Sequence, residues 1–203
     1  MVIATLLGAF FFAAAGLVGA LLGVTFADRL QALPDGPPQQ RVPIPLLVLG
    51  CAIIGAFITA RTFLPAQLVV LAIVCLALVA IWIVDARRGI VPDVFTLGPL
   101  AIILLVAILQ HEWLYLLSAA IPFVPFALAA VLSKGHGMGW GDVKLVALAG
   151  AVLGVKWSII ACIVACLAAV VVCYARGWRR GPIAFAPYLT AAIGAAIPMA
   201  VLH

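Results

Sequence analysis

Charged residues are scarce in this chain. Only 8% of its 203 residues are charged, whereas soluble domains run at about 25%. Hydrophobic residues make up 68% of the sequence. This imbalance excludes an ordinary soluble domain and predicts an all-α polytopic membrane protein whose partner is the lipid bilayer. The formal charge of +5 is then a signal of orientation in the membrane, and we expect no nucleic-acid partner.

Patterns that hold metals or carry nucleophilic catalysis are also missing. The five cysteines lie inside apolar runs and form no CxxC pair, so they are best interpreted as small packing residues. The three histidines are far apart along the chain, and no serine, cysteine or histidine constellation is visible. His136, flanked by glycines, is more typical of a flexible loop. We therefore expect neither a metal nor a cofactor.

Long apolar runs are what the sequence does contain. A helix that crosses about 30 Å of hydrocarbon needs about 20 apolar residues, which limits this chain to about eight spans. They can be placed at residues 2–26, 44–60, 65–84, 95–110, 113–132, 143–155, 158–175 and 182–202. We expect a single membrane-embedded domain over residues 1–203, with only a short polar connection at 27–41.

The basic residues predict the orientation of these spans. If the N-terminus lies outside, nine of the eleven basic residues fall in the connections after spans one, three, five and seven. Only Arg61 and Lys156 fall on the other side. Because cytoplasmic connections are enriched in lysine and arginine, we expect both termini to lie outside. Asp85 and Asp142 then lie at similar depth on the cytoplasmic side.

One segment, Gly135–Leu145, is polar and rich in glycine although it lies between two apolar runs. It reads GHGMGWGDVKL, and Asp142 follows its last glycine where the sixth span begins. That span has only about thirteen residues, roughly 20 Å of helix, so the segment dips into the membrane or the bilayer thins there. Irregular backbone at that depth is tolerated only inside protein or beside a wet cavity. The segment therefore indicates a site.

Each aspartate also has a purely structural interpretation. Asp142 can serve as the N-cap of the sixth helix, and Asp85 as an interfacial partner of Arg87 or Arg88. Taken as a pair they suit peptide hydrolysis, because two neighbouring carboxylates share one proton. The ionised aspartate activates a water molecule while the protonated one donates to the carbonyl oxygen.

Three motifs resemble those of the type IV prepilin peptidases. Residues 85–93, DARRGIVPD, followed by Phe95-Thr96-Leu97, resemble the first aspartate motif of that family. Residues 137–145, GMGWGDVKL, resemble the second motif, which is built on GxGD. Residues 181–189, GPIAFAPYL, are similar to the family's last-span motif. The resemblance covers about residues 65 to 203.

The resemblance implies a membrane aspartic endopeptidase of the bacterial inner membrane. Such enzymes cut the leader from type IV prepilins or pseudopilins at the cytoplasmic face and so serve pilus assembly or protein secretion. Asp85 and Asp142 would be the catalytic pair. Gly139 and Gly141 would let backbone approach the substrate, Lys144 would tune Asp142 or bind acidic substrate groups, and Asp93 would cap the fourth span. Positions implied to shape the site or bind substrate are Pro92, Asp93, Gly137, Gly139, Gly141 and Lys144.

The chain departs from the bifunctional members of that family. Those carry a large cytoplasmic insertion after the first span, with paired CxxC motifs for zinc and an N-methyltransferase activity that uses S-adenosylmethionine. Here the connection at 27–41 is about fifteen residues long and contains no cysteine. We therefore expect a peptidase without the zinc subdomain, and no methylation of its product.

Two other classes of protein fit part of the pattern. A proton-coupled transporter could use Asp85 and Asp142 as a relay, since acids inside membranes often serve that role. Against it, the two halves of the chain show no internal repeat, and both acids lie at one interface rather than near the midplane. A structural membrane scaffold would leave the polar glycine-rich segment without a purpose.

Overall fold

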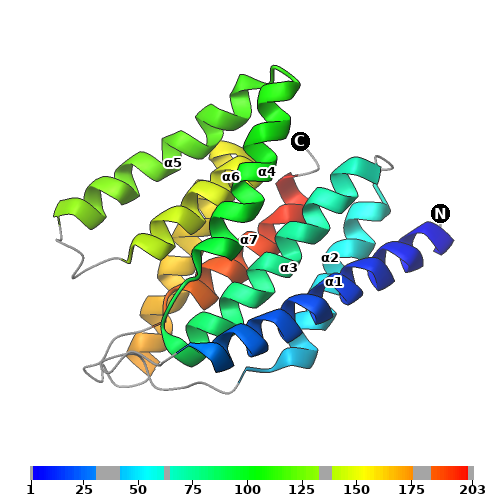
Figure 1. Ribbon diagram of the computed structural model, residues 1–203, viewed down its shortest axis with the longest axis horizontal. Coiled ribbons are helices and arrows are strands. Elements are labelled where there is room, and N and C mark those ends of the chain that lie inside the picture. The colour runs from blue at the N-terminus through cyan, green and yellow to red at the C-terminus, as the bar shows by residue number, and fades with distance from the viewer. Residues whose placement is uncertain (1, 31–41, 62–64, 133–138, 176–183, 201–203) are drawn as a thin grey trace.

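The computed structural model describes residues 2–30, 42–61, 65–132, 139–175 and 184–200. Helices are the only regular structure in these ranges, which confirms the all-α prediction for them (Figure 1). The helices are α1 Val2–Arg29, α2 Ile44–Thr59, α3 Pro65–Arg88, α4 Asp93–Leu109, α5 Trp113–Leu132, α6 Trp140–Ala175 and α7 Ala186–Ala200.

Four of these helices are long and apolar enough to cross a membrane, namely α1, α3, α5 and α6. The other three are shorter apolar helices. The protein is therefore a membrane protein with several spans. That eight segments cross the bilayer, and that both termini lie outside, stay predictions.

The predicted sixth and seventh spans both belong to α6. Gly154 interrupts this element with φ 74° and ψ 173°, a backbone conformation that essentially only glycine adopts. Figure 1 shows that the chain reverses direction at this point, so residues 140–153 and 155–175 run antiparallel. The eight predicted helical segments thus correspond to seven helices, one of which is folded back on itself.

Helices near the candidate site are longer than predicted. The sequence predicted that α1 ends at Phe26 and α3 at Val84, but they continue to Arg29 and Arg88. Asp85 consequently lies in the last turn of α3 rather than after it. The helix ends where Gly89 adopts φ 69°, and the Gly89 N–H donates to the Asp85 carbonyl oxygen at 2.8 Å. This is a common way for glycine to end a helix.

Glycines allow α1 to pack closely against its neighbours. A Cβ atom on Gly8 would collide with Thr59 of α2, and one on Gly19 would collide with the backbone of Leu76 in α3. Small residues that permit such close approach are the usual means of packing helices in lipid. The outward sides of α1 and α5 keep large apolar side chains exposed, as expected of surfaces that face lipid.

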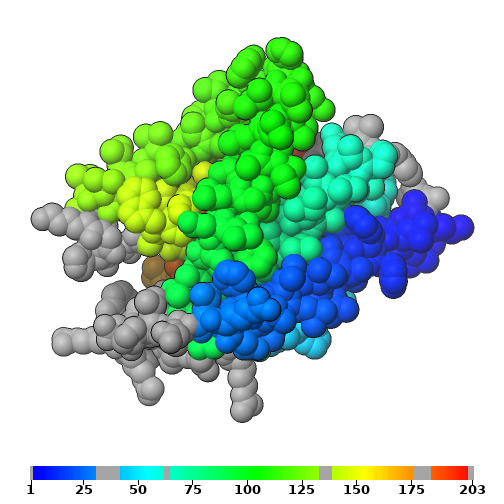
Figure 2. Space-filling view, viewed as in Figure 1, coloured from blue at the N-terminus to red at the C-terminus, as the bar shows by residue number. Residues whose placement is uncertain are grey.

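Four helices form a ring around the centre of the molecule. Both α3 and α6 pack against α4 and α7, yet no Cα atom of α3 lies within 8 Å of one in α6. Helices α1 and α2 pack outside the ring against α3, and α5 packs against α6. In the view of Figure 2, α1, α4 and α5 occupy most of the face. The two helices that carry Asp85 and Asp142 therefore lie diagonally across the ring.

Candidate active site

Asp85 is a buried carboxylate with one oxygen that has no partner among the described residues. Its residue is only 5% exposed, and its Oδ2 atom has no hydrogen-bond partner among the described residues. A buried polar atom that lacks a partner lowers stability. A buried side chain that is kept at such a cost is a candidate for function.

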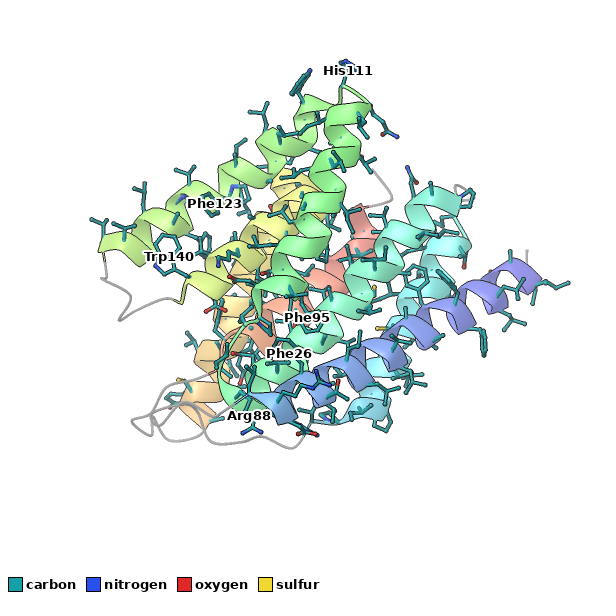
Figure 3. The ribbon with its side chains drawn as sticks, in the orientation of Figure 1. Phe26, Arg88, Phe95, His111, Phe123 and Trp140 are labelled. Carbon is teal, nitrogen blue, oxygen red and sulfur yellow. The ribbon has the colours of Figure 1, made fainter. Side chains whose placement is uncertain are left out.

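The arginines that follow Asp85 are bound elsewhere. Arg87 Nη1 lies 3.5 Å from Asp28 Oδ1, and Arg88 Nε donates to the Ala27 carbonyl oxygen at 2.6 Å. Both contacts tie the end of α1 to the end of α3, at the end of the molecule where Figure 3 labels Arg88. The interpretation of Asp85 as an ion-pair partner of Arg87 or Arg88 is therefore wrong.

Asp142 lies in the first turn of α6. The carbonyl oxygen of Gly139 accepts the N–H groups of Asp142 and Val143 at 3.1 and 3.3 Å, so Gly139 is the N-cap. The Asp142 carboxylate in turn accepts the N–H of Gly139. This is the arrangement of a capping box, in which the third helical residue reaches back to the cap. The interpretation of Asp142 as the N-cap is therefore wrong, because the N-cap is Gly139, three residues earlier in the chain.

The two aspartates come together although their helices do not. The carboxylates of Asp85 and Asp142 are close enough to interact electrostatically. Because α3 and α6 lie diagonally in the ring, this interaction takes place across its centre and not through packed helices. The two carboxylates are therefore within range of an electrostatic interaction, and their pairing as a catalytic dyad stays a prediction.

A third helix end completes the site, and the sequence did not predict its part. The backbone N–H of Ala186, the first residue of α7, donates to the Asp85 carboxylate. The first N–H groups of a helix have no partner within it and favour negative charge nearby. A backbone donor leaves no mark in the sequence. The available signal was Pro187, which is typical of the first turn of a helix.

Lys144 and Asp93 form an ion pair beside the two aspartates. Lys144 Nζ of α6 lies 2.7 Å from Asp93 Oδ1 of α4. The sequence predicted that Asp93 caps α4, but Pro92 is the N-cap and no side chain caps this helix. The prediction for Asp93 is therefore wrong, and the partner found for Lys144 is Asp93.

The glycines of the second motif have different surroundings. A Cβ atom on Gly141 would lie 2.6 Å from the Cβ of Val91, in the turn between α3 and α4. A Cβ atom on Gly139 would meet only Asp142 Oδ2, at an ordinary 3.5 Å. Gly141 thus permits a close contact between the two motifs, whereas Gly139 has no such close neighbour in the described ranges. Gly137 lies outside the described residues.

An aromatic pair lies at the same end of the molecule. The rings of Phe26 in α1 and Phe95 in α4 meet edge to face, with centroids 5.6 Å apart (Figure 3). Figure 3 also places His111 at the opposite end of the molecule. Among the described residues, no three His, Cys, Asp or Glu side chains are grouped so as to hold a metal ion.

A comparison with known protein families supports the resemblance. The model of the type IV leader peptidase family matches residues 72–174, which is just over half of the chain. The matched segment contains both aspartates together with the Val91–Gly141 and Asp93–Lys144 contacts. No curated protein and no solved structure matches the chain. The chain therefore belongs to the type IV leader peptidase family, and it is a membrane-embedded peptidase with a protein substrate.

Proposed function

We propose that this peptidase is an aspartic endopeptidase that removes the leader from type IV prepilins or pseudopilins. The observation that carries the proposal is the interaction between Asp85 and Asp142 across the ring. Neither side chain has the structural role that the sequence suggested for it, and the buried Asp85 has no partner for Oδ2 within the part of the chain that the structure describes. In a member of a peptidase family, such a pair is best explained as the catalytic dyad.

The dyad would work by general acid and base catalysis. Two interacting carboxylates hold one proton between them. The ionised aspartate takes a proton from water as the water oxygen attacks the peptide carbonyl. The protonated aspartate donates its proton to the carbonyl oxygen, which gives a gem-diol. The aspartate that took the proton from water then passes it to the leaving nitrogen as the C–N bond breaks, while the other aspartate takes a proton back from a gem-diol hydroxyl.

We assign the shared proton to Asp85 and the role of base to Asp142. Asp85 is the more buried residue, and burial disfavours a charge. It also lies in the last turn of α3, where the helix dipole opposes negative charge, although the Ala186 N–H offsets part of this. Asp142 is only partly buried, lies in a first turn and accepts the N–H of Gly139. All three features favour its ionised form.

The surroundings of the dyad support action at the cytoplasmic face of the inner membrane. Four described basic residues, Arg29, Arg87, Arg88 and Lys144, belong to the connections that the positive-inside rule assigns to the cytoplasm. Residues 1–203 would form one peptidase domain, in which the connection at 27–41 replaces the zinc-binding insertion.

The test is a cleavage assay with the protein reconstituted in liposomes. The substrate is a prepilin with a basic leader that ends in glycine before a phenylalanine-led apolar helix. Asp85→Asn and Asp142→Asn should each reduce the cleavage rate by about 10²–10⁴-fold, because each removes one partner of the acid–base pair. Asp28→Asn is the matched control, since Asp28 lies at the same end in an exposed ion pair and should change the rate by less than about threefold.

Two outcomes would contradict the proposal. One is cleavage that persists in Asp85→Asn or Asp142→Asn while the protein remains folded and inserted. The other is a wild-type protein that cleaves no prepilin but moves protons in a way that depends on both aspartates, which would favour the transporter. Adding labelled S-adenosylmethionine tests the predicted lack of methylation, because label on the new N-terminus would contradict it.

A further inference from the structure

We propose that residues 89–93, which are the short connection between α3 and α4 together with the first residue of α4, position Asp142 against Asp85. We refer to these residues as the 89–93 clasp. In this view Asp93 and Lys144 are positioning residues for the cleavage reaction and not ligands of the substrate. The inference rests on the proposed function, because it explains how the proposed dyad is held.

The need for such a device follows from the ring of helices. Carboxylates that act together must be held within a fraction of an ångström, and a misplacement of about 1 Å can cost about 10²-fold in rate. Direct packing of α3 on α6 cannot provide this, because no Cα atoms of the two helices lie within 8 Å. Their relative position must be set by elements that touch both.

The clasp is attached directly to Asp85. Gly89, its first residue, donates its N–H to the Asp85 carbonyl oxygen at 2.8 Å and adopts φ 69°. The chain therefore turns sharply after the aspartate, and α4 begins only four residues later at Asp93. So short a connection gives the clasp little freedom to move relative to Asp85.

The first contact of the clasp with α6 is steric. Val91 packs so closely on Gly141 that a Cβ atom on the glycine would lie 2.6 Å from the valine Cβ. Gly141 directly precedes Asp142 in the chain. The contact therefore fixes how closely the first turn of α6 approaches the end of α3.

The second contact is the ion pair between Asp93 and Lys144. The Nζ–Oδ1 distance is 2.7 Å, and the side chains are 59% and 29% exposed. Exposed ion pairs contribute little to stability, so a role in global folding does not explain this one. Located two residues beyond Asp142, it limits rotation of the first turn of α6. Together the two contacts hold Asp142 from both sides.

The arrangement also argues against Lys144 as a ligand for the substrate. Its ammonium group already lies against a carboxylate, so an acidic group of the substrate would have to displace Asp93. If the lysine acts through Asp93, then removing either residue should have the same consequence as removing both. A substrate ligand would behave differently, because its loss would weaken substrate binding whether Asp93 is present or not.

A double-mutant cycle tests the proposal with the liposome assay and the same prepilin. Asp93→Asn, Lys144→Gln and the double variant should each lower kcat by about tenfold, with KM unchanged, and the double should be no worse than either single variant. Thermal unfolding temperatures should stay close to wild type. If Lys144→Gln raises KM while Asp93→Asn has no effect, Lys144 binds substrate and the proposal is wrong. Effects that simply add would also overturn it.

A second measurement does not depend on cleavage. Amide hydrogen exchange of residues 139–145, followed by mass spectrometry, should become faster in Asp93→Asn and in Lys144→Gln. Asp28→Asn, which removes the Asp28–Arg87 ion pair at this end, should leave that exchange unchanged. Unchanged exchange in both clasp variants would refute the clasp even if the dyad cleaves prepilin. Faster exchange in a protein that cleaves no prepilin would keep the clasp and reject the proposed function.

Discussion

The two halves of the site are built in opposite ways. Asp85 lies at the end of a helix, is 5% exposed and is followed by arginines that tie α3 to α1. Asp142 lies at the start of a helix, is only partly buried and follows two exposed residues, Gly139 and Trp140. One carboxylate lies within the core of the protein. The other lies where the core ends, because Gly139 and Trp140 are exposed whereas Val143 is fully buried.

This difference has a physical origin in the two helices. The last ten residues before Arg87 in α3 are all buried except Trp82, so packing on every side defines where Asp85 lies. Close packing of this kind leaves little room for a change in side-chain volume. At the start of α6, a Cβ atom on Gly139 would meet only Asp142 among the described residues, whereas one on Gly141 would press against Val91. The two halves should therefore respond unequally to similar substitutions.

Lengthening each aspartate by one methylene should give the largest difference in cleavage rate between the two halves of the site. Asp85→Glu should reduce the cleavage rate by about 10²-fold or more, because an enclosed side chain cannot shift to bring its carboxylate back into place. Asp142→Glu should cost about tenfold, because its partly exposed surroundings let the longer side chain adjust. Steady-state cleavage of prepilin in liposomes measures both. Equal losses, or a larger loss for Asp142→Glu, would show that burial does not distinguish the two halves.

Substitutions of Gly139 and Gly141 test the half of the site that contains Asp142 on its own. Gly141→Ala should lower kcat by about tenfold, because its Cβ atom would press against Val91 and displace Asp142. Gly139→Ala is the matched control and should stay within about threefold, since its Cβ atom would meet no described atom closer than Asp142 Oδ2, at an ordinary 3.5 Å, and only a modest capping preference is lost.

The tight contact at Gly141 also predicts a suppressor. Val91→Gly removes the atom nearest to the new Cβ, so it should restore part of the activity that Gly141→Ala loses. Cleavage by the single and double variants measures this. If Gly139→Ala is as harmful as Gly141→Ala, or if Val91→Gly restores nothing, then the glycines act through a different contact, such as the approach of the substrate backbone.

The sequence predicted the helices of this site better than their ends. Polar residues after Val84 indicated where the bilayer ends, but a helix continues until its backbone is interrupted. Nothing interrupts α3 before Gly89, so Asp85 and both arginines are helical. At α4, an aspartate next to the helix start suggested a cap. Pro92 takes that position instead, which leaves Asp93 free to pair with Lys144.

The sequence also predicted the meeting of the two aspartates but not how they are held. Topology placed Asp85 and Asp142 on one side of the membrane, and the family motifs paired them. The Lys144–Asp93 contact depends on how far α6 is rotated about its axis. The hydrophobic pattern of the sequence defines this rotation only coarsely. The hydrogen bond from Ala186 depends on a backbone group that every residue except proline carries. Neither contact could be derived from residue types alone.

The smallest expected effect is spectroscopic, and it tests the difference in charge between the two halves. If Asp85 carries the shared proton, the wild-type protein should show the infrared C=O band of a protonated carboxyl group at neutral pH. Asp85→Asn should abolish that band. Asp142→Asn should retain it, because burial still favours the protonated form of Asp85 after the Asp142 carboxylate has been removed. The chain has only six acidic residues, and the side chains of Asp28 and Asp93 are more than half exposed, so few other groups can contribute to the band.

A band that survives Asp85→Asn and disappears in Asp142→Asn would reverse the assignment of acid and base. A wild-type protein without any such band would mean that both carboxylates are ionised, and the buried Asp85 would then need a compensating positive charge beyond the Ala186 N–H.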